Sequence, residues 1–133
     1  MTNALDILLR MDIPEPQRKE IKVKRLSKLA GEPVTFTIRE LTFSRVAEIK
    51  EQHNEDGEMA VFTLLAGVTS PNLKDKALLE KYGAATPAEL VKKLLTPGEI
   101  EDISRAVEIL SGYRTATIEE VKKNSTGAPT ASS

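Results

Sequence analysis

The sequence of 133 residues contains no cysteine and no tryptophan, and only 4% of its residues are aromatic. The missing cysteines exclude disulfide bonds, thiolate metal sites and a cysteine nucleophile. So few aromatic side chains also argue against the stacking surfaces on which proteins bind single-stranded nucleic acids. These absences remove several classes of catalytic and binding protein before any motif is considered.

Neither sign of charge dominates, because 19 Lys and Arg stand against 20 Asp and Glu. The chain therefore lacks the general attraction to phosphate on which nucleic-acid binders rely, and nucleic acid is not expected as a partner. Its apolar runs are far shorter than the ~20 residues that span a bilayer, so no membrane contact is expected. The stretch Met1–Asp6 has no basic region and carries an acid, which argues against a secretory signal.

Helix-start signals are abundant between residues 68 and 113. Thr86 and Thr96 are each followed by a proline and, three residues after the threonine, by Glu89 and Glu99. A hydroxyl at the N-cap, proline at the first helical position and a carboxylate three residues on are typical of a helix start. Ser70-Pro71 resembles the same signal without the glutamate and predicts a third start.

In the rest of the chain, apolar residues recur either at every second position, as in strands, or at helical spacing. Residues 20–24 and 34–39 alternate apolar and polar side chains, which predicts an antiparallel strand pair, with a turn of helix between them. Residues 4–11, 42–53 and 59–67 have helical patterns, and the last is apolar nearly all round, as expected of a central helix. A buried strand is the competing interpretation of residues 59–67.

The N-terminal helix places Leu5, Leu8 and Leu9 on one stripe and is separated from the body by Pro14 and Pro16. It is either a piece of the core or a docking element. We favour the core, because apolar helix faces are usually buried within their own domain.

Together these patterns predict a mainly α fold: a compact bundle of short helices with a minor antiparallel β-hairpin at about residues 20–39. Residues 1–113 are expected to form a single domain, a length typical of one hydrophobic core. Residues 114–133 are expected to form a flexible tail, disordered at its Ser/Thr/Ala-rich end, because such a composition buries too little apolar surface to offset ordering entropy.

No catalytic, metal or cofactor site is expected. His53 is the single histidine, and a zinc site would need at least two further ligands at suitable spacing. We interpret His53 as part of a solvated helix end beside an acidic loop. Phosphate loops, nucleophile elbows and dinucleotide fingerprints are also missing from the sequence.

A small DNA-binding regulator of the helix-turn-helix type is an alternative, because short helices follow one another at tight turns and carry several lysines. These are Lys74, Lys76, Lys81, Lys92 and Lys93. The last helix argues against it, because its acidic residues make a poor surface for phosphates.

The order of signals resembles the XkdN-like family of phage and prophage tail assembly chaperones. The residues that carry the resemblance are Pro71 to Asp75, Gly83 to Pro87, Gly98 to Ile100 and Ile109 to Gly112. The match is clear over about residues 60–113 and looser over residues 1–59. No catalytic residues come with it.

The resemblance implies a non-enzymatic chaperone that binds the tape measure protein and keeps it soluble until the tail tube polymerises. It further implies residence in the bacterial cytoplasm, absence from the mature virion, and contact with tail tube protein through a longer frameshifted form. A structural tail or virion component is a further alternative, and a homo-oligomer stays open. The residues expected to bind the partner are Leu5, Leu8, Leu9, Leu90, Leu94, Ile103 and Val107.

Overall fold

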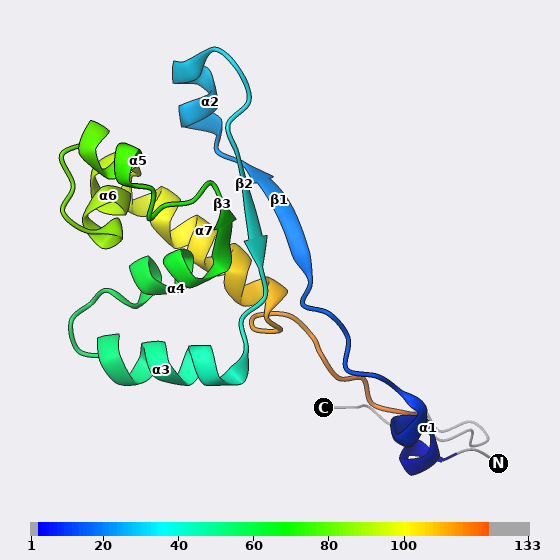
Figure 1. Ribbon diagram of the computed structural model, residues 1–133. Coiled ribbons are helices and arrows are strands. Elements are labelled where there is room, and N and C mark those ends of the chain that lie inside the picture. The colour runs from blue at the N-terminus through cyan, green and yellow to red at the C-terminus, as the bar shows by residue number, and fades with distance from the viewer. Residues whose placement is uncertain (1–2, 123–133) are drawn as a thin grey trace.

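The computed structural model describes residues 3–122. Helices dominate this part of the chain, as the sequence predicts, and a small antiparallel sheet accompanies them (Figure 1). In chain order the elements are α1 (Ala4–Arg10), β1 (Arg18–Lys22), α2 (Lys24–Ala30), β2 (Thr35–Arg39), α3 (Phe43–His53), α4 (Met59–Gly67), β3 (Val68–Ser70), α5 (Lys76–Lys81), α6 (Pro87–Leu94) and α7 (Pro97–Leu110).

The sheet has the strand order β1-β2-β3. The predicted pairing of β1 with β2 is confirmed, with Ile21 opposite Phe36, and α2 lies in the connection between them. Strand β3 was not predicted, because it is only three residues long and follows α4 without a break. It pairs with β2 near Ile38, so the hairpin is attached to the helical body through its second strand.

One predicted helix start is wrong. Ser70 pairs with Thr37 in the sheet, and residues 71–75 after it form no helix. Helix α5 begins instead at Lys76, where the Asp75 carboxylate accepts a hydrogen bond from the Leu78 N–H at 3.0 Å. Asp75 therefore takes the capping role that the sequence pattern assigned to a serine.

The other two start signals are confirmed. The hydroxyls of Thr86 and Thr96 accept hydrogen bonds from the N–H groups of Glu89 and Glu99, each at 3.1 Å. The Glu99 carboxylate also accepts from the Thr96 N–H at 2.8 Å, which completes a reciprocal capping box. Both threonines thus satisfy N–H groups that a helix end would otherwise leave unpaired.

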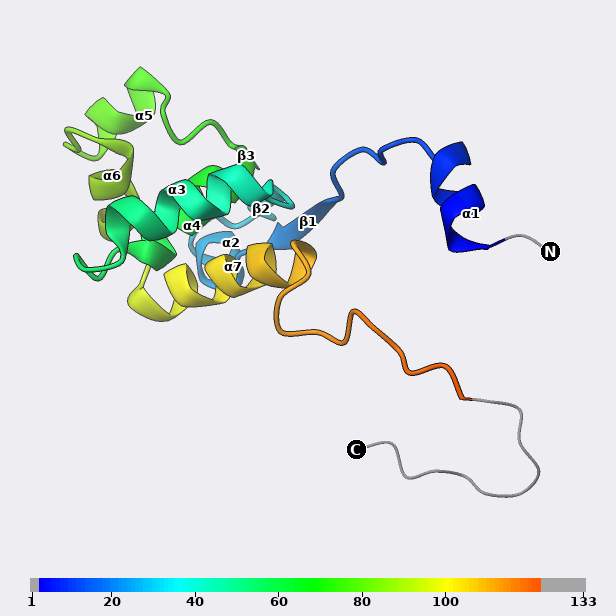
Figure 2. The ribbon, with the colours of Figure 1, turned by 90° about the horizontal axis from the view of Figure 1, so that it is seen from below.

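The core forms around α4, which packs against α3, α6 and α7 (Figure 2). Leu64 of α4 is fully buried, and Val107 of α7 is fully buried against the same helix. Close approach of the two helices depends on Gly67, because a Cβ built there would lie 2.5 Å from Val107 Cγ2. The interpretation of residues 59–67 as a central helix is therefore confirmed.

Helix α1 lies apart from the other elements and is joined to β1 by an extended segment (Figures 1 and 2). None of its residues is buried. The expectation that α1 belongs to the core is therefore wrong, because Pro14 and Pro16 hold an extended spacer between this helix and the body. Residues 114–122 form neither helix nor strand, and the predicted disorder of the last residues falls outside the described part of the chain.

Candidate partner-binding surfaces

Exposed large apolar side chains are concentrated on α1 and in the segment that follows it. Leu5, Leu8 and Leu9 are 63%, 64% and 75% exposed, and Ile13 in the following segment is 95% exposed. A contiguous patch of this kind on a soluble domain usually marks a surface that binds a partner. We call these four side chains the α1 apolar surface.

Local interactions within α1 favour its helical conformation. The Asn3 side chain accepts a hydrogen bond from the Asp6 N–H at 2.9 Å and caps the first turn. Asp6 in the first turn and Arg10 in the last turn each oppose the partial charge at their end of the helix. Asn3, Asp6 and Arg10 also share one stripe, so the polar side chains are gathered on one side and apolar ones cover the rest.

The structure places the other predicted partner-binding residues differently. Leu90 and Val107 are fully buried and Ile103 is 5% exposed, while Leu94 is partly buried against the core. Close packing of α4 and α6 against α7 covers these side chains. Leu90 and Val107 therefore hold the fold together and present no surface to a partner in this conformation, and Ile103 keeps only a small exposed part.

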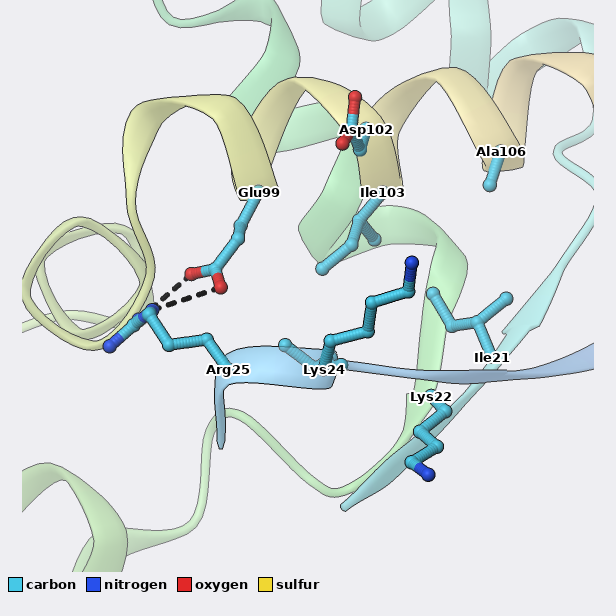
Figure 3. A pocket seen from close by; sticks show the side chains of 9 residues that line it. Ile21, Lys22, Lys24, Arg25, Glu99, Asp102, Ile103 and Ala106 are labelled. Carbon is cyan, nitrogen blue, oxygen red and sulfur yellow. Dashed lines mark hydrogen bonds and ion pairs between the residues drawn. The ribbon is translucent and has the colours of Figure 1, made fainter. Parts of the chain in front are cut away.

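A groove runs between β1, the start of α2 and α7 (Figure 3). It has a volume of about 410 Å³, and Ile21, Val23, Ile103 and Ala106 form its apolar walls. The charged side chains around them are Lys22, Lys24, Arg25, Glu99 and Asp102. We call this feature the β1–α7 groove. Sequence reasoning missed it, because its two sides lie far apart in the chain.

One end of the groove is closed by an ion pair between α2 and α7. The Arg25 guanidinium donates hydrogen bonds to both carboxylate oxygens of Glu99, at 3.0 and 2.8 Å (Figure 3). It also donates to the Leu94 carbonyl at 2.9 Å. Two parallel hydrogen bonds fix the relative orientation of the two groups as well as their distance. Arg25 thus joins the hairpin to the start of α7.

The charges of this pair alter its protonation equilibria. The hydrogen bond from Arg25 is the main reason that the pKa of the Glu99 carboxyl lies below its usual value near 4.5. In return, the hydrogen bond to Glu99 raises the pKa of Arg25. Both groups are therefore charged at neutral pH.

The lysines that suggested DNA binding are partly engaged within the protein. Lys92 pairs with Glu58, and Lys93 pairs with Glu89 at 3.3 Å. Lys93 also donates to the Gly83 carbonyl at 2.8 Å, which joins α6 to the end of α5. Pairing with nearby acids weakens the positive potential that a phosphate backbone would need.

His53 is not simply solvated, as the sequence suggested. Its ring stacks on Phe62, with centroids 3.6 Å apart and planes 5° from parallel, and its Nδ1 lies 2.9 Å from the Asp56 carboxylate. The imidazole therefore joins the end of α3 to α4. Within residues 3–122 no group of three or more possible metal-ligating side chains comes together.

Across the described residues, no helix has both the length and the apolar character to cross a membrane.

Comparisons with known proteins agree on the type of fold and identify a family. The family model described as phage XkdN-like tail assembly chaperone protein matches residues 5–123. No curated protein matches the chain. Among solved structures, the crystal structure of the protein yqbn, a structural genomics target, is similar with a TM-score of 0.67 and 19% identity. That alignment covers 85% of this chain and 99% of the other, and at such an identity it shows a shared fold.

Proposed function

The chain belongs to the family of phage XkdN-like tail assembly chaperones, and we propose that its client is the tape measure protein of a tailed phage or prophage. The chaperone would cover apolar surface on this long helical protein and keep it soluble until tail tube subunits polymerise around it. The role is one of binding and release, without catalysis.

The observation that supports this client is the α1 apolar surface. A helix that carries exposed leucines on a spacer, away from the folded body, suits packing against another apolar helix. The spacer also lets α1 reach the client without rearranging the core, because no side chain of α1 is buried in the body. Family membership thus indicates a role in tail assembly, and α1 is the surface that we propose contacts the client.

The size of α1 suits a complex that must later come apart. Helix α1 has seven residues and is therefore about 10 Å long. A contact of this length buries much less than the ~1,200 Å² at which stable interfaces begin, so each chaperone would be held weakly. Growing tail tube protein could then displace it.

The proposal places the protein in the cytoplasm of the bacterial host and leaves it out of the finished particle. A longer frameshifted form would bring tail tube protein to the complex, as the family resemblance implies. Mass spectrometry of purified particles tests the first point. Stoichiometric recovery of this chain from intact virions would favour a structural tail component instead.

Co-expression with the tape measure protein tests the proposed client. We expect the soluble fraction of that protein to rise when the chaperone is present, and to fall again when Leu8 and Leu9 are both replaced by glutamate. Leu29→Glu is the matched control, because Leu29 on α2 is 73% exposed and lies outside α1. A tape measure protein that stays insoluble with the wild-type chain, with no complex recovered, would rule out this function.

A further inference from the structure

We propose that, in the absence of a client, the β1–α7 groove of one chain binds α1 of a second copy of the same chain. The inference goes beyond the proposed function, because it concerns the protein alone and requires no tape measure protein. It assigns an occupant to a surface that the packed core does not use.

The groove and α1 have matching chemistry. The groove offers the half-buried side chains of Ile21 on β1 and Ala106 on α7, one from each of its two walls. The leucines of α1 are exposed and meet no other element within the described residues. Both surfaces therefore leave apolar area in water, and burying one against the other removes both from solvent.

The polar side chains of the two surfaces also fit this arrangement. Lys24 extends into the groove from α2, and Asp102 lies on the opposite side on α7 (Figure 3). On α1, Asp6 and Arg10 occupy the same stripe, about 6 Å apart along the helix axis. With Leu5, Leu8 and Leu9 turned into the groove, this polar stripe lies on the opposite side of the helix and stays in water, as in an amphipathic helix seated in a groove.

The connection between α1 and β1 favours a second copy over the chain's own groove. Residues 11–17 form neither helix nor strand, are all exposed, and contain Pro14 and Pro16. A proline-rich segment of this kind is a semi-rigid spacer, and here it directs α1 away from the body (Figures 1 and 2). To reach its own groove, α1 would have to reverse direction and run back along the whole of β1.

A reciprocal exchange produces a closed dimer. Each copy would donate α1 and accept the partner's α1, so the two contacts are related by a twofold axis and no surface is left to propagate. The exchange also protects the α1 apolar surface until a client is available. Client binding and self-association would then compete for the same leucines.

Sedimentation of the purified full-length chain tests the dimer. We expect a concentration-dependent dimer. Its dissociation constant should rise at least tenfold with Leu9→Glu in α1, and likewise with Ala106→Glu in the groove. The Leu9→Glu variant removes no core contact, so it stays informative if the Ala106→Glu variant fails to fold. A wild-type chain that remains monomeric, or a dimer that neither change weakens, would overturn the proposal.

Crosslinking identifies the contact directly, because the natural chain has no cysteine. One tagged chain would carry Leu9→Cys and a second, differently tagged chain Ala106→Cys, and a short bismaleimide reagent would be added to the co-expressed pair. We expect a crosslink between the two chains, and none when Glu55→Cys in the loop after α3 replaces the groove cysteine. No crosslink with Ala106→Cys, or an equal yield with both partners, would contradict exchange of α1.

Discussion

Arg25 and Glu99 are 74 positions apart in the sequence, yet their side chains form two hydrogen bonds of 3.0 and 2.8 Å. Glu99 also completes the capping box of α7 through the Thr96 N–H. One carboxylate therefore serves two purposes: it starts a helix, and it fixes the hairpin beside that helix. The shape of the β1–α7 groove depends on this arrangement.

Glu99→Gln should destabilise the fold at neutral pH, because it removes the charge that pairs with Arg25. The folded pKa of Glu99 is lowered, so its stabilising contribution is present above the unfolded value near 4.5 and is lost as pH falls through the folded value. The difference in unfolding free energy between wild type and variant should therefore be clear at pH 7 and vanish in acid. Denaturant unfolding across this pH range measures it.

Glu101→Gln is the matched control for that series. Glu101 lies on the same helix, is exposed and forms no ion pair within residues 3–122. Its substitution should leave the stability nearly unchanged at both ends of the pH range. An equal loss for the two variants would mean that the Arg25 pair contributes nothing.

Gly67→Ala should destabilise the core, because the new Cβ would lie 2.5 Å from Val107 Cγ2. Overpacking of this kind costs about 1–3 kcal/mol, which opposes and should exceed the gain of up to ~1 kcal/mol from replacing glycine in a helix. Gly98→Ala is the control, since nothing lies within 4 Å of a Cβ built there. Thermal unfolding should show a lower midpoint for the first variant and no such loss for the second.

Thr96→Ala should lower the unfolding free energy by about 1 kcal/mol, the usual cost of losing a capping hydroxyl. Thr96→Ser retains the oxygen that accepts from the Glu99 N–H and should restore most of the stability. Chemical denaturation of the three proteins measures the difference. If serine and alanine were equally destabilising, packing of the threonine methyl group would be the explanation in place of the cap.

Much of the fold could be predicted because its signals are local. A threonine, a proline and a glutamate at fixed spacing act within one helical turn, so α6 and α7 begin where the sequence indicates. The alternation in residues 20–24 and 34–39 likewise reports one buried face of a strand pair. Strand β3 has no such signal, because its three residues are held by pairing with β2.

The candidate site was only partly predictable, because exposure depends on distant packing. The leucine patterns of α1 and of α6 look alike in the sequence, yet Leu9 is 75% exposed and Leu90 is fully buried. The difference arises from the neighbours of each helix: α6 packs against α4 and α7, whereas α1 extends from a proline-rich spacer. The β1–α7 groove needs contacts across most of the chain and leaves no local pattern.

Affinity for the tape measure protein tests the central claim most directly. We would titrate a labelled helical segment of that protein with the wild-type chain, with Leu5, Leu8 and Leu9 all replaced by glutamate, and with Leu29→Glu as the control. Because burying one leucine contributes about 1.5–3 kcal/mol, the triple variant should bind at least tenfold more weakly, and its melting temperature should not change. Equal affinity of the triple variant and the wild type would contradict the account.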